Sequence, residues 1–167
     1  MNPRNIVLFE GEFSRLKTIL ARTQRALSAD LVALIERSGQ TLVHDGPAQD
    51  IDLTALASLA AANLAATDGL ARVVGEPEFS VLYHQGKHRN IHISAVMKRF
   101  CLVVVFNDAV SLGMVRLRVK HAGAYLEELF GRLNRQQSQA SEAGAAPKAA
   151  GTELEFTDEE IDKLFGN

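Results

Sequence analysis

The chain has little cysteine, tryptophan or proline: its 167 residues include one cysteine, no tryptophan and four prolines. A single thiol, Cys101, excludes an internal disulfide framework and fits a reducing compartment. Because Cys101 lies in the apolar run FCLVVVF, we expect it to pack in a core and to be a poor nucleophile. The N-terminal residues lack a basic segment followed by a long apolar stretch, so we expect a cytoplasmic protein.

An excess of charge is also missing, because 18 Lys and Arg residues face 20 Asp and Glu residues for a net charge of −2. Binding to nucleic-acid phosphates needs a concentrated basic surface, and neither half of this chain is strongly basic. We therefore expect no nucleic-acid partner. The hydrophobic content of 47% is enough for one modest globular domain with its own core.

Motifs for nucleotide binding and catalysis are absent from the sequence. Gly86-Lys87 lacks the remaining residues of a P-loop, and neither Gly-x-Gly-x-x-Gly nor Gly-x-Ser-x-Gly occurs. We expect no cofactor, no catalytic residue and therefore no enzyme. His84, His88 and His92 recur every four residues, but no cysteine or carboxylate completes a tetrahedral set at a recognised spacing. We expect no metal site.

The segment Leu53–Thr67, LTALASLAAANLAAT, has no charged residue and lies between Asp52 and Asp68. A helix that is apolar all round must be covered on more than one side. Helical spacing separates a stripe of larger residues (Leu53, Leu56, Ala60, Leu64, Ala71, Val74) from a stripe of small ones (Ser58, Ala61, Ala62, Ala65, Gly69). The small stripe is typical of a protein interface, with burial inside a monomer as the alternative. The uncharged run is shorter than the roughly 20 residues of a membrane span, so we expect no membrane-spanning helix here.

The remaining pattern predicts an α+β fold. A helix over residues 10–28 is followed by strands at DLVALIER and TLVHD, the uncharged helix ending at Gly75, strands over 79–85, 90–96 and 100–106, and a helix from Leu112 to Leu133. Phe13, Leu16, Leu20, Thr23 and Leu27 mark the core face of the first helix. This order predicts a five-stranded antiparallel sheet with helices on both faces. We place the domain at residues 9–133, a flexible linker at 134–155 and a short helix at 156–167.

Three groups outside the uncharged helix are candidates for interactions. Phe79, Val81 and Tyr83 form a strand with little to protect its edge, which predicts pairing between two copies, and Asn63 is placed at the same interface or against the sheet. Arg116, Arg118 and Lys120 lie at the unfavourable end of a helix dipole, and either contact an acidic partner or are ordinary solvated charges. In the tail, a capping box of Thr157 and Glu160 precedes Ile161, Leu164 and Phe165 on one face, which predicts a helix that docks.

Together with the order of elements, the stretches LASLAAANLAATDGLARVVGEPEF and SLGMVRLRVKHA resemble the Roadblock/LC7 family, and within it the bacterial regulators of cell polarity and motility. The resemblance implies a homodimer with a continuous sheet, whose central helices bind a small Ras-like GTPase of the MglA type. It implies stimulated GTP hydrolysis through the GTPase's own switch residues, without an arginine finger, and a protein clustered at a cell pole. By this resemblance Ala65 and Gly69, with Ala61 and Ala62, contact the GTPase.

Two alternatives stay open under this resemblance. Roadblock proteins also serve as adaptors that bind a GTPase without altering its chemistry. In addition, the acidic tail resembles a segment that aids nucleotide exchange on the GTPase. Through the string Asp-Glu-Glu-Ile-Asp-x-Leu at residues 158–164, it also resembles the response-regulator-binding segment of the flagellar switch protein. A response regulator is therefore a second candidate partner.

Overall fold

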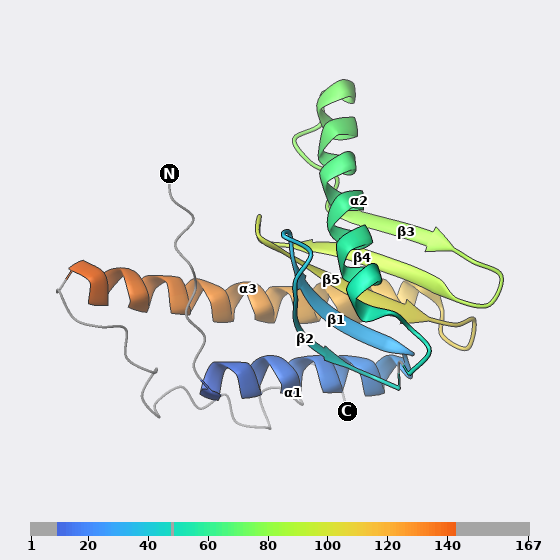
Figure 1. The fold of residues 1–167 in the computed structure, drawn as a ribbon, viewed down its shortest axis with the longest axis horizontal. Coiled ribbons are helices and arrows are strands. Elements are labelled where there is room, and N and C mark those ends of the chain that lie inside the picture. The colour runs from blue at the N-terminus through green and yellow to red at the C-terminus, as the bar shows by residue number, and fades with distance from the viewer. Residues whose placement is uncertain (1–9, 48, 143–167) are drawn as a thin grey trace.

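The computed structural model describes residues 10–47 and 49–142, which form three helices and one sheet (Figure 1). The sheet has five strands in the order β2-β1-β5-β4-β3, and every neighbouring pair is antiparallel. The elements are α1 (Glu10–Leu27), β1 (Leu31–Glu36), β2 (Thr41–Asp45), α2 (Leu53–Val74), β3 (Val81–Gln85), β4 (Asn90–Val96), β5 (Phe100–Phe106) and α3 (Leu112–Glu142). The predicted element order and fold class are confirmed.

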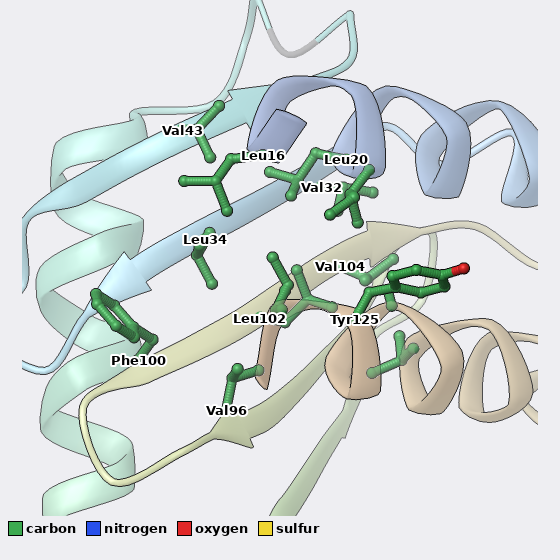
Figure 2. Close-up of a cluster of buried hydrophobic side chains, with 14 of the residues drawn as sticks. Leu16, Leu20, Val32, Leu34, Val43, Val96, Phe100, Leu102, Val104 and Tyr125 are labelled. Carbon is green, nitrogen blue, oxygen red and sulfur yellow. The ribbon is translucent and has the colours of Figure 1, made fainter. Parts of the chain in front are cut away.

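The sheet separates two cores because successive side chains of a strand point to opposite faces. In the central strand β5 every residue is buried. Phe100, Leu102, Val104 and Phe106 face α1 and α3, whereas Cys101, Val103 and Val105 face α2. Figure 2 shows the larger core, in which Leu16 and Leu20 of α1 and Tyr125 of α3 lie over the strands. The helices thus occupy opposite faces, with α2 alone on one of them.

Local signals fix the ends of α2. The Asp52 side chain accepts a hydrogen bond from the Ala55 amide at 2.9 Å, which satisfies one of the free N–H groups of the first turn. At the other end Gly75 adopts a left-handed conformation (φ 77°), where a residue without a Cβ atom is unstrained. The end at Gly75 was predicted. The helix extends past the uncharged run and includes Asp68 and Arg72.

Some details differ from the sequence-based expectations. Phe13 was expected on the core face of α1 but is 43% exposed, and Val74 was expected in the packed stripe of α2 but is 64% exposed. Both lie near the ends of their helices, where helical spacing continues but no further layer of protein covers the side chain. Strand β3 begins at Val81, so Phe79 precedes the strand instead of opening it. Helix α3 continues beyond Leu133 to Glu142, and the predicted boundary between domain and linker falls inside it.

The predicted docking helix, with Ile161, Leu164 and Phe165, lies outside the described residues. So does the part of the predicted linker that follows Glu142. Among the described helices, α2 is long and apolar enough to cross a membrane by length and composition. The uncharged run Leu53–Thr67 is shorter than the helix itself, which has 22 residues. The ionised residues Asp68 and Arg72 within α2, and its packing on the sheet, are typical of a helix of a globular domain.

Candidate protein-interaction surface

Helix α2 is covered by its own sheet on one side only. Its buried residues are Ala57, Ala60, Ala61, Leu64, Thr67 and Ala71. Of these, Ala57, Ala60 and Leu64 lie in one core cluster with residues of β1 and β5. The opposite side is exposed and apolar, and we call it the outer α2 face: Leu59, Ala62, Ala66, Leu70 and Val73. Leu59 is 64% exposed, Leu70 61% and Val73 82%. Large apolar side chains gathered at this exposure are typical of an interaction site.

The C-terminal half of α2 projects beyond the strands at the β3 side of the sheet (Figure 1). This overhang explains why Val74, which continues the sheet-facing side of α2, is exposed, whereas Leu70 and Val73 are exposed as members of the outer α2 face. By contrast, Ala57, Ala60 and Leu64 in the N-terminal half are fully covered. A sheet that continued past β3 would cover the overhang in the same way.

The predicted small stripe divides between two roles. Ala62 and Ala65 are exposed and Gly69 is half-buried, as a contact surface requires. Ala61 is 8% exposed and therefore supports the helix instead of belonging to the contact surface, which corrects the sequence interpretation. Ser58 faces the protein's own β1–β2 turn: a Cβ atom on Gly39 would lie 3.3 Å from the Ser58 Cα atom. Small residues thus permit close packing within the protomer as well.

Four residues of the outer α2 face were not predicted from the sequence: Leu59, Ala66, Leu70 and Val73. Their signal was present, since they continue the three-and-four spacing opposite Ala57 and Leu64. In a helix that is apolar all round, however, this spacing does not show which side packs on the sheet. Here the side that packs on the sheet is mostly alanine, and larger side chains are exposed on the opposite side.

An ion pair fixes the flank of α2 to the sheet. The Arg37 guanidinium at the end of β1 donates to the Asp68 carboxylate of α2, and both side chains are about one-third exposed. The hydrogen bond with Arg37 lowers the pKa of Asp68, and the same bond raises that of Arg37. The Arg37 amide also donates to the Arg99 carbonyl at 2.9 Å. Neither charge is left uncompensated beside the outer α2 face.

Strand β3 forms one edge of the sheet, and no other strand in the described ranges pairs with its outer side. The Ala95 amide donates to the Ser80 carbonyl at 2.8 Å, just beyond the Val81–Ser94 pair. Hydrogen-bonded and non-bonded pairs alternate in antiparallel ladders, so Val81 and Tyr83 direct their N–H and C=O groups toward the open edge. Val81 is 45% exposed. This edge can accept a further strand.

The other residues expected at the dimer interface differ in what they offer. Phe79 is 39% exposed beside the start of β3. The Tyr83 ring stacks on Phe106 at 6.3 Å between centroids, so its side chain belongs to the protomer core and only its backbone reaches the edge. Asn63 is half-buried on α2.

The predicted basic group lies on the other side of the sheet. Arg116, Arg118 and Lys120 belong to α3, whose buried side packs in the core opposite α2. A partner seated on the outer α2 face of a protomer therefore does not reach that protomer's basic group. Arg116 and Lys120 are exposed, whereas Arg118 is half-buried.

The three histidines do not converge. His92 pairs with Tyr83 and Val104 on the α3 face, whereas His84 pairs with Ile91 on the α2 face and His88 lies in the turn between them. Within residues 10–47 and 49–142, no three His, Cys, Asp or Glu side chains are grouped to hold a metal ion. Cys101 is fully buried, and burial raises the pKa of its thiol to about 11, consistent with the packing role expected from the sequence.

The Roadblock/LC7 domain profile matches residues 15–106, more than half of the chain. The chain belongs to the Roadblock/LC7 family. Its fold is similar to that of Myxococcus xanthus MglB, with a TM-score of 0.72 and 39% identity over 76% of this chain and 96% of that one. It is also similar to the gliding protein MglB of Thermus thermophilus, with a TM-score of 0.70 and 32% identity over 77% and 97% of the two chains.

A third solved structure, described as MglB with tetrameric arrangement, has a TM-score of 0.71 and 31% identity over 80% of this chain and 99% of that one. No curated protein matches the sequence. This Roadblock/LC7 protein is therefore similar to MglB over nearly the whole length of the MglB chains, which supports an MglB-type regulator.

Proposed function

We propose that this Roadblock/LC7 protein is a homodimeric, MglB-type regulator of a small Ras-like GTPase. The observation that carries the proposal is the outer α2 face, which is apolar and exposed beside an open sheet edge. Antiparallel pairing of two β3 edges extends the sheet and supplies the layer missing beneath the overhang of α2. Val74, at the end of the overhang, is then covered by the second copy, which removes an exposed apolar side chain from water.

The centre of the outer α2 face stays open in such a dimer. Ala62 and Ala66 are exposed there and Ala65 is exposed beside them, and two α2 helices side by side offer a wide surface of small side chains to a GTPase of the MglA type. Side chains this short lose no rotamer entropy when a partner covers them. The surface suits a partner that contributes its own anchoring residues.

The proposed activity is stimulation of GTP hydrolysis without an inserted arginine. Hydrolysis depends mainly on positioning the water and stabilising charge on the phosphates. A surface that binds the competent arrangement of the GTPase switch segments more tightly raises the population of that arrangement. Arg37, on the flank of α2, is held by Asp68, so it is not assigned a role in the reaction.

The test is single-turnover GTP hydrolysis by an MglA-type GTPase with and without this protein. Arginine in place of Ala62 or Ala65 is expected to abolish stimulation while dimerisation persists, because a long charged side chain then stands in the contact surface. Ser14→Arg on α1, which is exposed on the other side of the sheet, is the matched control. Full stimulation by the Ala62→Arg and Ala65→Arg proteins would contradict the assigned surface.

A second candidate function is an adaptor that binds a GTPase or a response regulator without altering its chemistry. The observation in its favour is that the outer α2 face consists of aliphatic side chains only. Such side chains bind a partner but contribute no group to phosphoryl transfer. Binding of the GTPase without any change in its single-turnover rate would favour the adaptor. Binding of a response regulator that is lost on deletion of residues 156–167 would identify that partner.

A further inference from the structure

A hollow lies on the face of the sheet opposite the outer α2 face. It runs between α3 and the β3–β4 edge, has a volume of about 720 Å³ and is called here the α3 groove. Its apolar lining includes Val81, Ala95 and Val119. Its polar lining includes His92, Arg116, Lys120 and, at the other end, Glu127. The proposed GTPase site does not use any of these residues.

His92 indicates that the α3 groove takes a polar ligand. The side chain is 1% exposed, and neither ring nitrogen has a hydrogen-bond partner among the described residues. Buried polar side chains nearly always have a hydrogen-bond partner. An unpartnered imidazole beside a cavity therefore indicates that a ligand in the cavity supplies the hydrogen bond. Arg116 and Lys120, which stand beside it along α3, favour a ligand with negative charge.

The chain contains a segment with matching chemistry outside the described residues. Residues 153–162 include six acidic side chains, and Leu154, Phe156, Ile161, Leu164 and Phe165 supply apolar ones nearby. Lys163 of the same segment carries the charge opposite to that of Glu127. An amphipathic segment commonly binds by placing its apolar side chains in a groove, with charged residues at the rim.

We propose that residues 153–165 of this chain dock in the α3 groove, with Ile161 and Phe165 against its apolar lining and the acidic side chains beside Arg116 and Lys120. The proposal goes beyond the GTPase-binding function and needs no GTPase. It assigns the tail a binding site on its own dimer, on the face that a partner seated on α2 leaves free.

The length of the chain permits this contact. At 1.5 Å per residue, Glu142 lies about 23 Å along α3 from Glu127 and about 33 Å from Lys120. A chain as long as residues 143–157 spans about 20 Å as a random coil and about 50 Å when extended. The tail can therefore fold back along α3 to the groove of its own protomer.

The test uses the full chain with a nitroxide label at Asn167→Cys and ¹⁵N NMR. The buried Cys101 should not take up the label, which the same treatment of the unmodified protein checks. We expect the amide signals of Val81, Ser94 and Gly123 to lose most of their intensity, and those of Val43 on β2 to keep theirs. Mixing labelled and unlabelled chains shows whether the tail belongs to the same protomer.

Two variants test the chemistry. Arg116→Glu combined with Lys120→Glu is expected to restore the groove signals, whereas Lys17→Glu combined with Lys98→Glu, an equal change at exposed positions, is expected to leave them broadened. Gly123→Leu fills the groove without changing charge. A Cβ atom there meets nothing within 4 Å, and leucine favours a helix more than glycine does, so this variant is expected to fold and to restore the signals.

Other outcomes would overturn the proposal. Uniform signal intensities, or broadening over the outer α2 face, would mean that the tail does not dock in the α3 groove. Concentration-dependent shifts of Gly123 and Glu127, which line the groove on α3 away from the β3 edge, in a chain ending at Glu142 would assign the groove to a contact between copies. None of these measurements contains a GTPase, so they remain independent of the hydrolysis assay.

Discussion

Replacing His92 with phenylalanine should remove a specific part of the protein's acid sensitivity. His92 lies on β4 between the sheet and α3, and it is 1% exposed. Burial, with a further contribution from the charge of Arg116, lowers the pKa of its imidazole from 6.5 to about 4. The α3 groove beside it leaves room for the slightly larger phenyl ring.

The sign of the effect follows from which state binds more protons. Between about pH 6.5 and pH 4 the unfolded chain carries a protonated His92 and the native protein a neutral one, so the native state loses stability as the pH falls. With these two pKa values, the free energy of unfolding should drop by about 2 kcal/mol between pH 7 and pH 5 through His92 alone. Above pH 7 the contribution vanishes, because both states are then neutral.

The assay is urea unfolding at pH 7 and pH 5, at fixed protomer concentration, for proteins ending at Glu142 with and without His92→Phe. We expect the loss of stability between the two pH values to be about 2 kcal/mol smaller in the variant. An equal loss in both proteins would refute the reasoning. In the full chain a docked tail carboxylate should raise the pKa of His92, so the difference should be smaller there.

Three further predictions concern other parts of the molecule. Val81→Pro should preserve the protomer fold, because proline is tolerated on a free edge, but weaken the dimer by about tenfold or more in analytical ultracentrifugation; an unchanged dimer would exclude β3 pairing. Asp68→Asn should lower the free energy of unfolding by only about 0.5 kcal/mol, since its ion pair with Arg37 is partly exposed; a loss of several kcal/mol by urea titration would mean that the pair is buried. Cys101 should react with a thiol reagent only after unfolding, and rapid modification of the native protein would contradict its burial.

Most of the fold could be predicted because its signals are local. The alternation of side chains in a strand, the capping aspartate at Asp52 and the glycine at Gly75 each act within a few residues. Helix α3 is an instructive case, since Val115, Leu117 and Val119 alternate with basic residues as in a strand. The longer three-and-four spacing up to Leu133 outweighed this alternation, and Leu117 is 47% exposed as a helix requires.

The candidate site was harder to predict because its geometry depends on contacts between distant segments. The Arg37–Asp68 pair joins residues 31 positions apart, which no local pattern reveals. The separation of Arg116 and Lys120 from the outer α2 face depends on which side of the sheet each helix crosses. In the same way, the sequence showed that α2 is apolar all round, but only its packing showed that Leu59, Leu70 and Val73 face outward.

The overhang of α2 connects the fold with the proposed assembly. A helix that ended at the sheet edge would have no part beyond β3 for the sheet of a second copy to cover. Because α2 continues past β3, one symmetric contact can cover the exposed Val74 and pair the open backbone groups of β3. The same contact sets the two central helices side by side, so that dimerisation and construction of the partner surface become one event. A variant that loses edge pairing, such as Val81→Pro, should therefore lose GTPase stimulation as well, although Val81 lies on the opposite side of the sheet from the proposed GTPase.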